Sequence, residues 1–234
     1  MVGASSGIGR ATAVALAEAG AGVVLAARRA AALADVAAEA GPGAHPVVCD
    51  VRDPAAVDRL AGAVGEHLGG LDIVVYASGV NRLAFLADTD AETWRELLET
   101  NLVGAALVTR AALPLLREAG GRVAYLSSHS VARPWPALGA YAVSKAGLDA
   151  MVSAWRVEEP AVALTRVVVG PTLTGMADAW DPEAAAAAFA RWAEQGYLVH
   201  EPVSADWVGR RLVSWAVASD PPEDLWLIDD PDRS

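Results

Sequence analysis

The sequence predicts an α/β fold, a doubly wound parallel sheet with helices on both faces, formed by one domain over residues 1–234. Short, continuous apolar runs alternate with helical patterns along the chain, as in buried parallel strands joined by right-handed crossover helices. A glycine-rich loop leads directly into the first helical pattern. Hydrophobic residues make up 54% of the chain and charged residues 20%, a composition that provides a sizeable core.

The elements follow one another in a regular order. Apolar residues at helical spacing predict a helix over 10–19, ended by Gly20 and Gly22, and the run 23–27 predicts a buried strand. The alternation then continues with a helix over 30–40, a strand over 45–51, a helix begun by Asp53 and Pro54, a strand over 71–78, a helix over 92–118 interrupted by Pro114, a strand over 122–128, a helix over 140–158 and a strand over 165–170. The segment 172–202 is expected to cover one end of the sheet.

Charge and cysteine content exclude several classes of protein. A net charge of −11 disfavours nucleic acid and anionic membranes as partners. The single cysteine, Cys49, cannot form an internal disulfide, and no Cys-x-x-Cys pair suggests a metal site. The sequence contains no signal peptide and no uncharged stretch of about 18 residues. We therefore expect a cytoplasmic protein without a metal and without a membrane-spanning segment.

The glycine-rich loop is the first candidate site. Gly3, Gly7 and Gly9 allow a tight turn before a helix whose N-terminal N–H groups and dipole suit a pyrophosphate. The expected phosphate-binding residues of the loop are Gly3, Ser5, Ser6, Gly7, Ile8 and Gly9. The same letters fit the nucleophile elbow of a hydrolase built on Ser5, with His129 or His200 as a later partner, and they also fit a loop that only turns.

A second candidate site lies between residues 127 and 145. Tyr141 and Lys145 are four positions apart in a helical pattern, so both project from one face. An ammonium beside a phenol is expected to lower the phenol pKa from about 10 and to make the tyrosine usable as an acid and base. Ser127 and Ser128 end a strand at the carboxyl edge of the sheet, where such sheets bind ligands.

Together, these motifs resemble the short-chain dehydrogenase/reductase family, whose members are Rossmann-like nicotinamide enzymes with a Ser-Tyr-Lys site. The resemblance covers the chain from Val2 to about Pro171. It selects Ser128, thirteen positions before Tyr141, as the catalytic serine. It implies that Tyr141 is the acid/base and that Lys145 binds the nicotinamide ribose and tunes the tyrosine. Asn101 matches the family asparagine that helps to hold a water for proton relay.

The resemblance also implies the remaining cofactor contacts. Asp50 and Val51 match the pair that contacts the adenine, and Thr172 and Thr174 could reach the nicotinamide amide. The further residues expected along the cofactor are Ala77, Gly79, Tyr141, Lys145 and Pro171. The family's Asn-Asn-Ala-Gly stretch is replaced here by residues 76–79, so cofactor binding is expected to be altered rather than lost.

The residues that follow the first predicted strand favour NADP(H) over NAD(H). A carboxylate for the ribose hydroxyl is expected about 20 residues after the loop, but the chain has Arg28 and Arg29 there. Two guanidinium groups suit a 2′-phosphate. The alternative is that one or both arginines only balance the acidic surface.

The expected function is hydride transfer between NADP(H) and a small-molecule carbonyl or alcohol. Trp180, Trp192 and Tyr197 lie in the covering segment and suggest a bulky, apolar substrate pocket, although they could equally pack the segment onto the body. The resemblance implies a homodimer or homotetramer formed through the helices over 92–118 and 140–158. One rival is a catalytically silent or truncated cofactor-binding protein, and another is the hydrolase on Ser5, which leaves Tyr141 and Lys145 without a role.

The loop at residue 3 follows no strand, although such a loop normally ends one. The resemblance places a strand of five or six residues before Val2, in the middle of the sheet. Each buried aliphatic side chain of that strand is worth roughly 1.5–3 kcal/mol, and its loss would leave two unpaired strand edges. We therefore expect the natural chain to begin upstream of Met1.

Overall fold

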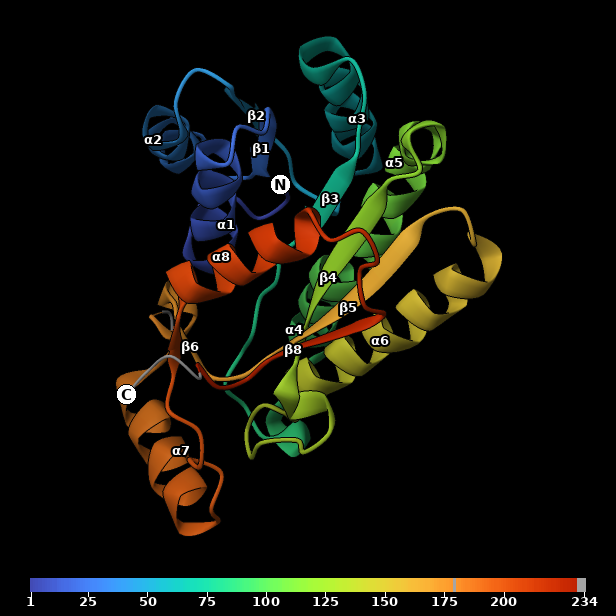
Figure 1. The fold of residues 1–234 in the computed structure, drawn as a ribbon. Helices are drawn as coiled ribbons and strands as arrows, with labels where there is room; N and C mark the ends of the chain where they lie inside the picture. The colour runs from blue at the N-terminus through green and yellow to red at the C-terminus, as the bar shows by residue number, and fades with distance from the viewer. Residues whose placement is uncertain (179, 231–234) are drawn as a thin grey trace.

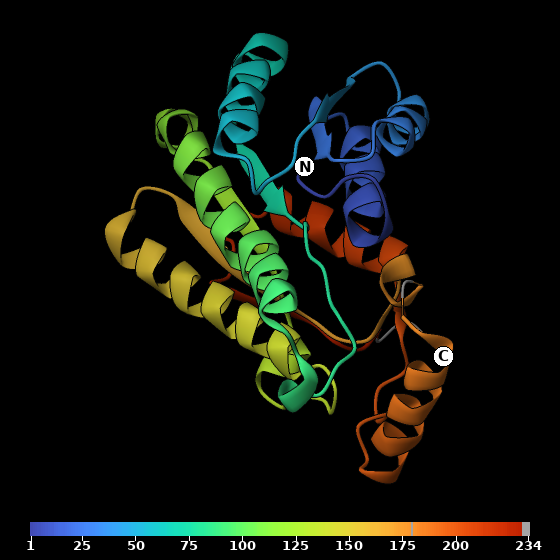
Figure 2. The same ribbon diagram turned by 180° about the vertical axis from the view of Figure 1, so that it is seen from behind.

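The computed structural model describes residues 1–178 and 180–230, and they form a parallel sheet with helices on both faces (Figures 1 and 2). The strands are β1 (Val23–Ala27), β2 (Ala44–Val48), β3 (Ile73–Tyr76), β4 (Arg122–Ser128), β5 (Ala163–Val169), β6 (Thr172–Leu173), β7 (Val203–Ser204) and β8 (Asp224–Leu227). The helices are α1 (Gly7–Glu18), α2 (Ala30–Ala40), α3 (Pro54–Leu68), α4 (Ala91–Leu98), α5 (Gly104–Ala119), α6 (Gly139–Glu158), α7 (Pro182–Glu194) and α8 (Ala205–Ala216). The predicted fold class is confirmed.

The main sheet has two parts that meet at the start of the chain. β2 pairs with β1, and β3, β4, β5 and β8 pair in that order, all in parallel. Between β1 and β3, Val2 forms a parallel bridge to Ala26 on one side and to Tyr76 on the other. β6 and β7 form a separate pair at the carboxyl end of the sheet. The order of the strands along the chain reverses at Val2. Open α/β sheets bind their ligands at such a switch point, outside the carboxyl ends of the strands.

One apolar layer lies on each face of the sheet. Helices α1, α2 and α8 cover one face, and α3, α5 and α6 cover the other (Figures 1 and 2). Side chains of β4 alternate between the layers: Val123 and Tyr125 face α5 and α6, whereas Ala124 and Leu126 face the opposite layer. Helix α7 projects beyond the carboxyl end of the strands (Figure 1). None of the helices among the described residues could span a bilayer.

The long helix predicted over 92–118 differs from the structure in one respect. Pro114 was expected to interrupt it, but Pro114 lies inside α5, where Leu113 and Leu116 are buried against the sheet and hold the turn in place. The irregularity lies instead at the π-helical turn Glu99–Val103. Such turns often mark functional sites, and this one carries Asn101.

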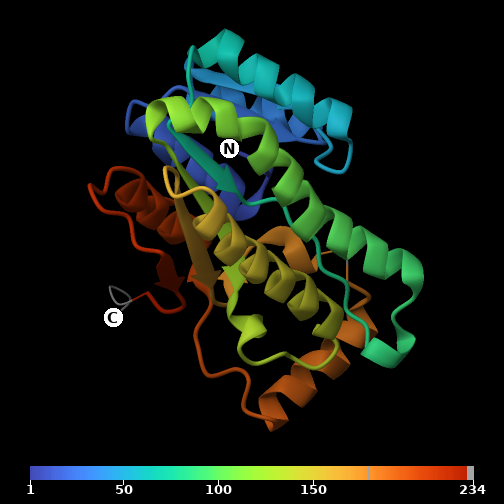
Figure 3. The ribbon, with the colours of Figure 1, turned by 90° about the vertical axis from the view of Figure 1, so that its right-hand side faces the viewer.

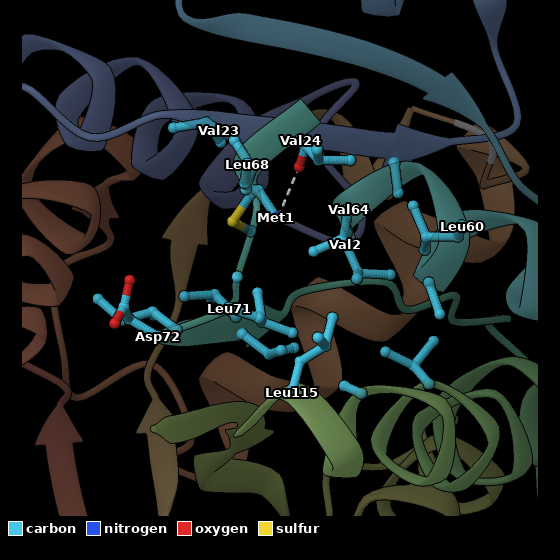
Figure 4. A pocket seen from close by; sticks show the side chains of 18 of the residues that line it. Met1, Val2, Val23, Val24, Leu60, Val64, Leu68, Leu71, Asp72 and Leu115 are labelled. Atoms are coloured by element: carbon cyan, nitrogen blue, oxygen red, sulfur yellow. Dashed lines mark hydrogen bonds between the residues drawn. The ribbon is translucent and has the colours of Figure 1, made fainter. Parts of the chain in front are cut away.

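A cavity of about 370 Å³ lies between β1 and β3, below Val2. Figure 4 shows its apolar lining, which includes Val24, Leu60, Leu71 and Leu115. The Met1 ammonium enters this space and donates a hydrogen bond of 2.8 Å to the Val24 carbonyl oxygen. Burial lowers the pKa of that ammonium from 8.0 to about 5. Met1 and Val2 therefore bridge β1 and β3 through backbone hydrogen bonds, above this cavity.

Candidate active site

The glycine-rich loop has a backbone that only glycine accommodates. Gly3 has a φ of +85° and Gly7 a φ of +52°, in the left-handed region. A Cβ on Gly3 would lie 2.5 Å from the Ser78 backbone nitrogen, and one on Gly9 would lie 2.0 Å from the Gly3 oxygen. The loop is therefore packed directly against the segment after β3, and both meet at the carboxyl edge of the sheet.

The start of α1 keeps its N–H groups free of a side-chain cap. Ser6 occupies the N-cap position but makes no capping hydrogen bond. Its hydroxyl instead accepts a 2.7 Å hydrogen bond from Arg29, which also donates to the Ser5 hydroxyl at 3.1 Å. Four N–H groups at a helix start lack partners within the helix, so this loop fits the phosphates of a dinucleotide.

The other cofactor residues predicted from the sequence have neighbours both at this loop and away from it. Thr174 lies against Gly7, because a Cβ on that glycine would meet its side chain at 3.2 Å. Asp50 forms a 2.6 Å ion pair with Arg52, and Val51 is buried beside Gly104. Thr172 donates to the Gly170 oxygen, and the Pro171 oxygen accepts from Val203. Ile8 packs on the α1 layer together with Ala77.

The two adjacent arginines face different groups. Arg29 contacts the loop through Ser5 and Ser6, whereas Arg28 acts on Asp50. The hydrogen bond from Arg52 is the main cause that holds the pKa of Asp50 below its usual range, and the charge of Arg28 adds to it. The hydrogen bonds from Arg29 place one guanidinium directly at the helix start.

The structure brings Ser128, Tyr141, Lys145 and Asn101 together. Ser128 ends β4, and its hydroxyl faces Tyr141, which lies in the first turn of α6. Lys145 lies one turn further along α6 and is 4% exposed, with Nζ 5.9 Å from the centre of the Tyr141 ring. A Cβ on Gly79 would lie 3.4 Å from Asn101 Oδ1 and 3.5 Å from Lys145 Nζ. Gly79, in the segment after β3, is therefore packed against both of these side chains.

The predicted direction of the tyrosine pKa shift is wrong for this structure. Burial raises the pKa of Tyr141, and a hydrogen bond from Ser128 opposes that rise only in part. Lys145 does not contact the phenol directly, because its ammonium donates a 2.7 Å hydrogen bond to the Leu126 oxygen. Burial also lowers the pKa of Lys145 to about 8, against the opposing charge of Asp149. The phenol is consequently neutral near pH 7.

Asn101 is fixed by its own hydrogen bonds. Its side-chain amide donates to the Val80 oxygen at 2.9 Å and to the Ser144 hydroxyl at 2.8 Å, and its Oδ1 accepts from the Val80 N–H at 2.8 Å. Asn101 is fully buried. It thus connects the loop after β3 to α6 at Ser144, the residue before Lys145.

Sequence reasoning missed two residues of this site. Ser130 is buried, and its hydroxyl lies 2.9 Å from that of Ser128, whose oxygen also accepts the Ser130 N–H at 3.2 Å. Asp149 is buried behind Lys145. The signal for Asp149 was its position four residues after the lysine, on the same helix face. Ser127, the alternative to Ser128, faces Asp149 and not Tyr141.

The aromatic residues of the covering segment pack against the body. Trp192 is 2% exposed, its ring centre lies 5.0 Å from that of Trp135, and its indole N–H donates to the Pro136 oxygen. The Trp180 indole donates to Asn81 at 3.0 Å, and Arg133 lies 3.9 Å from the Tyr197 ring centre. Residue 179 lies outside the described residues. Of the two interpretations of these rings, packing is the one for which the structure gives contacts.

A parallel sheet with a glycine loop at its switch point and a serine, tyrosine and lysine beside it defines a dinucleotide-dependent oxidoreductase. Comparison with known proteins agrees, since the family model for the short chain dehydrogenases matches residues 1–185. The chain belongs to this family.

Relatives from other organisms share both sequence and fold. A short-chain type dehydrogenase/reductase of Picea abies is 36% identical over 200 residues, which are 79% of this chain and 74% of that protein. An alcohol dehydrogenase of Thermococcus sibiricus, solved in complex with 5-hydroxy-NADP, superposes with a TM-score of 0.84 at 26% identity, covering 100% of this chain and 97% of the other. A short-chain type dehydrogenase/reductase of Mycobacterium marinum gives a TM-score of 0.85 at 26% identity and covers 100% and 94%. The protein is an NAD(P)-dependent oxidoreductase of this family.

Proposed function

We propose that the chain transfers a hydride between NADP(H) and a small-molecule carbonyl or alcohol, with Tyr141 as acid and base. The observation that carries the proposal is the meeting of Ser128, Tyr141 and Lys145 beside the loop after β3. A bound nicotinamide would supply or accept the hydride. Its pyrophosphate would lie at the start of α1, held by the loop 3–9, and its ribose near Lys145.

Tyr141 moves the proton in this mechanism. Because burial keeps its phenol neutral near pH 7, Tyr141 is prepared to donate a proton to a carbonyl oxygen that accepts a hydride. The Ser128 hydroxyl, held by Ser130 at 2.9 Å, would orient that oxygen. The Lys145 ammonium would stabilise the phenolate left behind, and Asn101 would hold the loop and helix that frame the proton path. In the oxidation of an alcohol, Tyr141 takes the proton back.

Arg29 supports NADP(H) as the cofactor. Its guanidinium is held at the Ser5 and Ser6 hydroxyls and is available to a 2′-phosphate, since no carboxylate follows β1 at the position of a ribose-binding acid. The solved relative that carries an NADP derivative is consistent with this assignment, with NAD(H) as the alternative.

Changing Arg29 to alanine is expected to weaken NADPH binding about tenfold to a hundredfold and to leave NADH binding nearly unchanged. A charge-assisted hydrogen bond to a phosphate is worth about 1.5–3 kcal/mol, and NADH lacks that phosphate. Titration of intrinsic tryptophan fluorescence with each nucleotide measures both affinities. The control is Arg210→Ala, which removes an exposed arginine from α8. Equal losses for the two nucleotides would contradict a 2′-phosphate contact.

The rival functions have less support. Ser5 is hydrogen-bonded to Arg29, whereas His129 and His200 contact each other with ring centres 5.4 Å apart. This arrangement does not favour a hydrolase on Ser5. A silent cofactor-binding protein would bind nucleotide and turn over no carbonyl, so an assay of NADPH oxidation against a panel of aldehydes and ketones separates it from the enzyme.

We further propose that residues 1–234 act as one nucleotide-binding domain whose segment 172–202 covers a substrate with a bulky, apolar part. A reducing compartment such as the cytoplasm suits the single cysteine, Cys49, which is buried and unpaired. Association through α5 and α6 is supported by Val143 and Val157 of α6, which are 49% and 82% exposed. Light scattering of the purified chain is expected to give the mass of a dimer or tetramer, and a monomer at micromolar concentration would refute this association.

A further inference from the structure

Asp149 is a buried charge that the mechanism above does not use. It is 9% exposed and lies one helical turn after Lys145 on α6. Residues four apart on a helix have Cβ atoms about 5–6 Å from each other. The carboxylate and the ammonium are both withdrawn from water, so their attraction is screened much less than at the surface.

Burial raises the pKa of Asp149, whereas the polar and charged groups around it act in the opposite direction and favour its ionised form. Arg166 of β5 approaches Asp149 Oδ2 to 3.4 Å, and Ser127 of β4 faces the carboxyl and lowers its pKa, as do Arg166 and Lys145. Burial acts in the opposite direction and gives a net rise in the pKa of Asp149. Ser127 Oγ and Asp149 Oδ1 are both buried, and neither makes a hydrogen bond within the described part of the chain. Ser127 is nevertheless the hydroxyl that acts on the Asp149 carboxyl.

Further charges continue the arrangement toward the edge of the sheet. Arg166 Nη2 lies 2.5 Å from Asp224 Oδ2 on β8, and the Arg156 guanidinium approaches Asp224 Oδ1 to 3.1 Å. Charges therefore alternate in sign from Lys145 through Asp149, Arg166 and Asp224 to Arg156. Tyr141 is the titratable group on the other side of Lys145. The Asp149 carboxylate therefore faces two cations, Arg166 at 3.4 Å and Lys145 one helical turn away.

We propose that Asp149 is a positioning residue that keeps Lys145 protonated at neutral pH, with Ser127 and Arg166 holding its carboxylate in place. The consequence for turnover rests on the proposed function, in which the Lys145 ammonium stabilises the Tyr141 phenolate. The adjacent serines Ser127 and Ser128 then have different roles. Ser127 acts on Lys145 through Asp149, and Ser128 acts on Tyr141.

Lys145 is the only lysine in the chain, which makes the test direct. Protein labelled with ¹³C,¹⁵N-lysine gives a single side-chain signal, and its titration reports the charge of Lys145 whether or not the enzyme turns over. The wild type is expected to titrate at about pH 8. In Asp149→Asn the midpoint should fall by about one pH unit or more, since an opposite charge at this range shifts a pKa by about 1–3. Asp149→Glu should restore it in large part.

Asp58→Asn serves as the matched control. Asp58 is an exposed aspartate on α3 with an arginine partner 3.8 Å away, and its loss should leave the lysine midpoint unchanged. A midpoint in Asp149→Asn within about 0.3 pH unit of the wild type would overturn the proposal. If that variant does not fold, the wild type decides: its Lys145 signal should show a second inflection at acid pH as Asp149 is protonated, and a single inflection would overturn the proposal.

Turnover supplies the second readout. The basic limb of the kcat profile should move to lower pH in Asp149→Asn together with the lysine midpoint, whereas a purely structural loss would lower kcat at every pH. A shifted NMR midpoint in a protein with no oxidoreductase activity would refute the proposed function and leave the role of Asp149 toward Lys145 intact. An unshifted midpoint in an active enzyme would refute the role of Asp149 toward Lys145 and leave the proposed function intact.

Discussion

Replacement of Tyr141 by phenylalanine is expected to lower kcat by about 10²–10⁴-fold, the range that general acid–base catalysis contributes. The ring would remain against Lys145 and keep its packing, because only the hydroxyl that receives the hydrogen bond from Ser128 is removed. NADPH affinity should change by less than about threefold, since the phenol oxygen is assigned to the substrate and not to the phosphates. Steady-state assays and nucleotide titration on one preparation measure both quantities.

Tyr125→Phe is the matched control for this change. Tyr125 is a buried tyrosine of β4 whose hydroxyl lies 2.8 Å from that of Thr109. Its loss should lower stability by about 1 kcal/mol and leave kcat within about twofold. If Tyr141→Phe retained the wild-type rate, Tyr141 would not be the acid and base. If both variants lost activity equally, the effect would be one of packing.

Extending the chain in front of Met1 with five apolar, β-branched residues is expected to stabilise the protein. The extension would enter the cavity between β1 and β3 (Figure 4) and continue the parallel bridges that Val2 makes to Ala26 and Tyr76. Burial yields about 1.5–3 kcal/mol per side chain against about 1–2 kcal/mol per residue for backbone ordering. A net gain of at least about 2 kcal/mol would raise Tm by about 4–8 °C, which calorimetry detects.

The same extension should also remove a pH dependence. The Met1 amine has a pKa of about 5 in the folded chain and 8.0 as its ordinary value, so the unfolded state binds more protons between these pH values. The stability of the 234-residue chain should therefore rise with pH across this window. Below pH 5 the buried, protonated amine lowers the free energy of unfolding by its full amount, on the order of 4 kcal/mol as an upper bound. Above pH 8 this loss of stability is absent.

An extension of five glycine and serine residues separates the two effects. It moves the charge out of the cavity and abolishes the pH dependence between 5 and 8, but it has no aliphatic side chains to fill the space. Urea unfolding at pH 5, 6.5 and 8 compares the three chains. If the apolar extension stabilised no more than the glycine-serine one, the space between the strands would not accept a strand.

How far the sequence predicts this molecule depends on whether an interaction is local. Apolar runs and turn residues determined the alternation of strands and helices, because burial on both faces of a parallel strand requires a continuous apolar stretch. The run 23–27 matches β1 residue for residue. The spacing of Tyr141 and Lys145 placed both on one helix face for the same local reason. The order of motifs then indicated the family, which the comparisons confirm.

Tertiary structure decided what depends on distant segments. The sign of the Tyr141 pKa shift depends on burial from several sides, which outweighs a neighbour four residues away. Pro114 stays within α5 because the surrounding turns are packed on the sheet. Arg29, and not Arg28, contacts Ser5 and Ser6, and this choice depends on how the end of β1 is placed against the loop. The placement of Asp149 between Lys145 and Arg166 joins α6 to β5, and electrostatic coupling of this kind follows distance in space and not position along the chain.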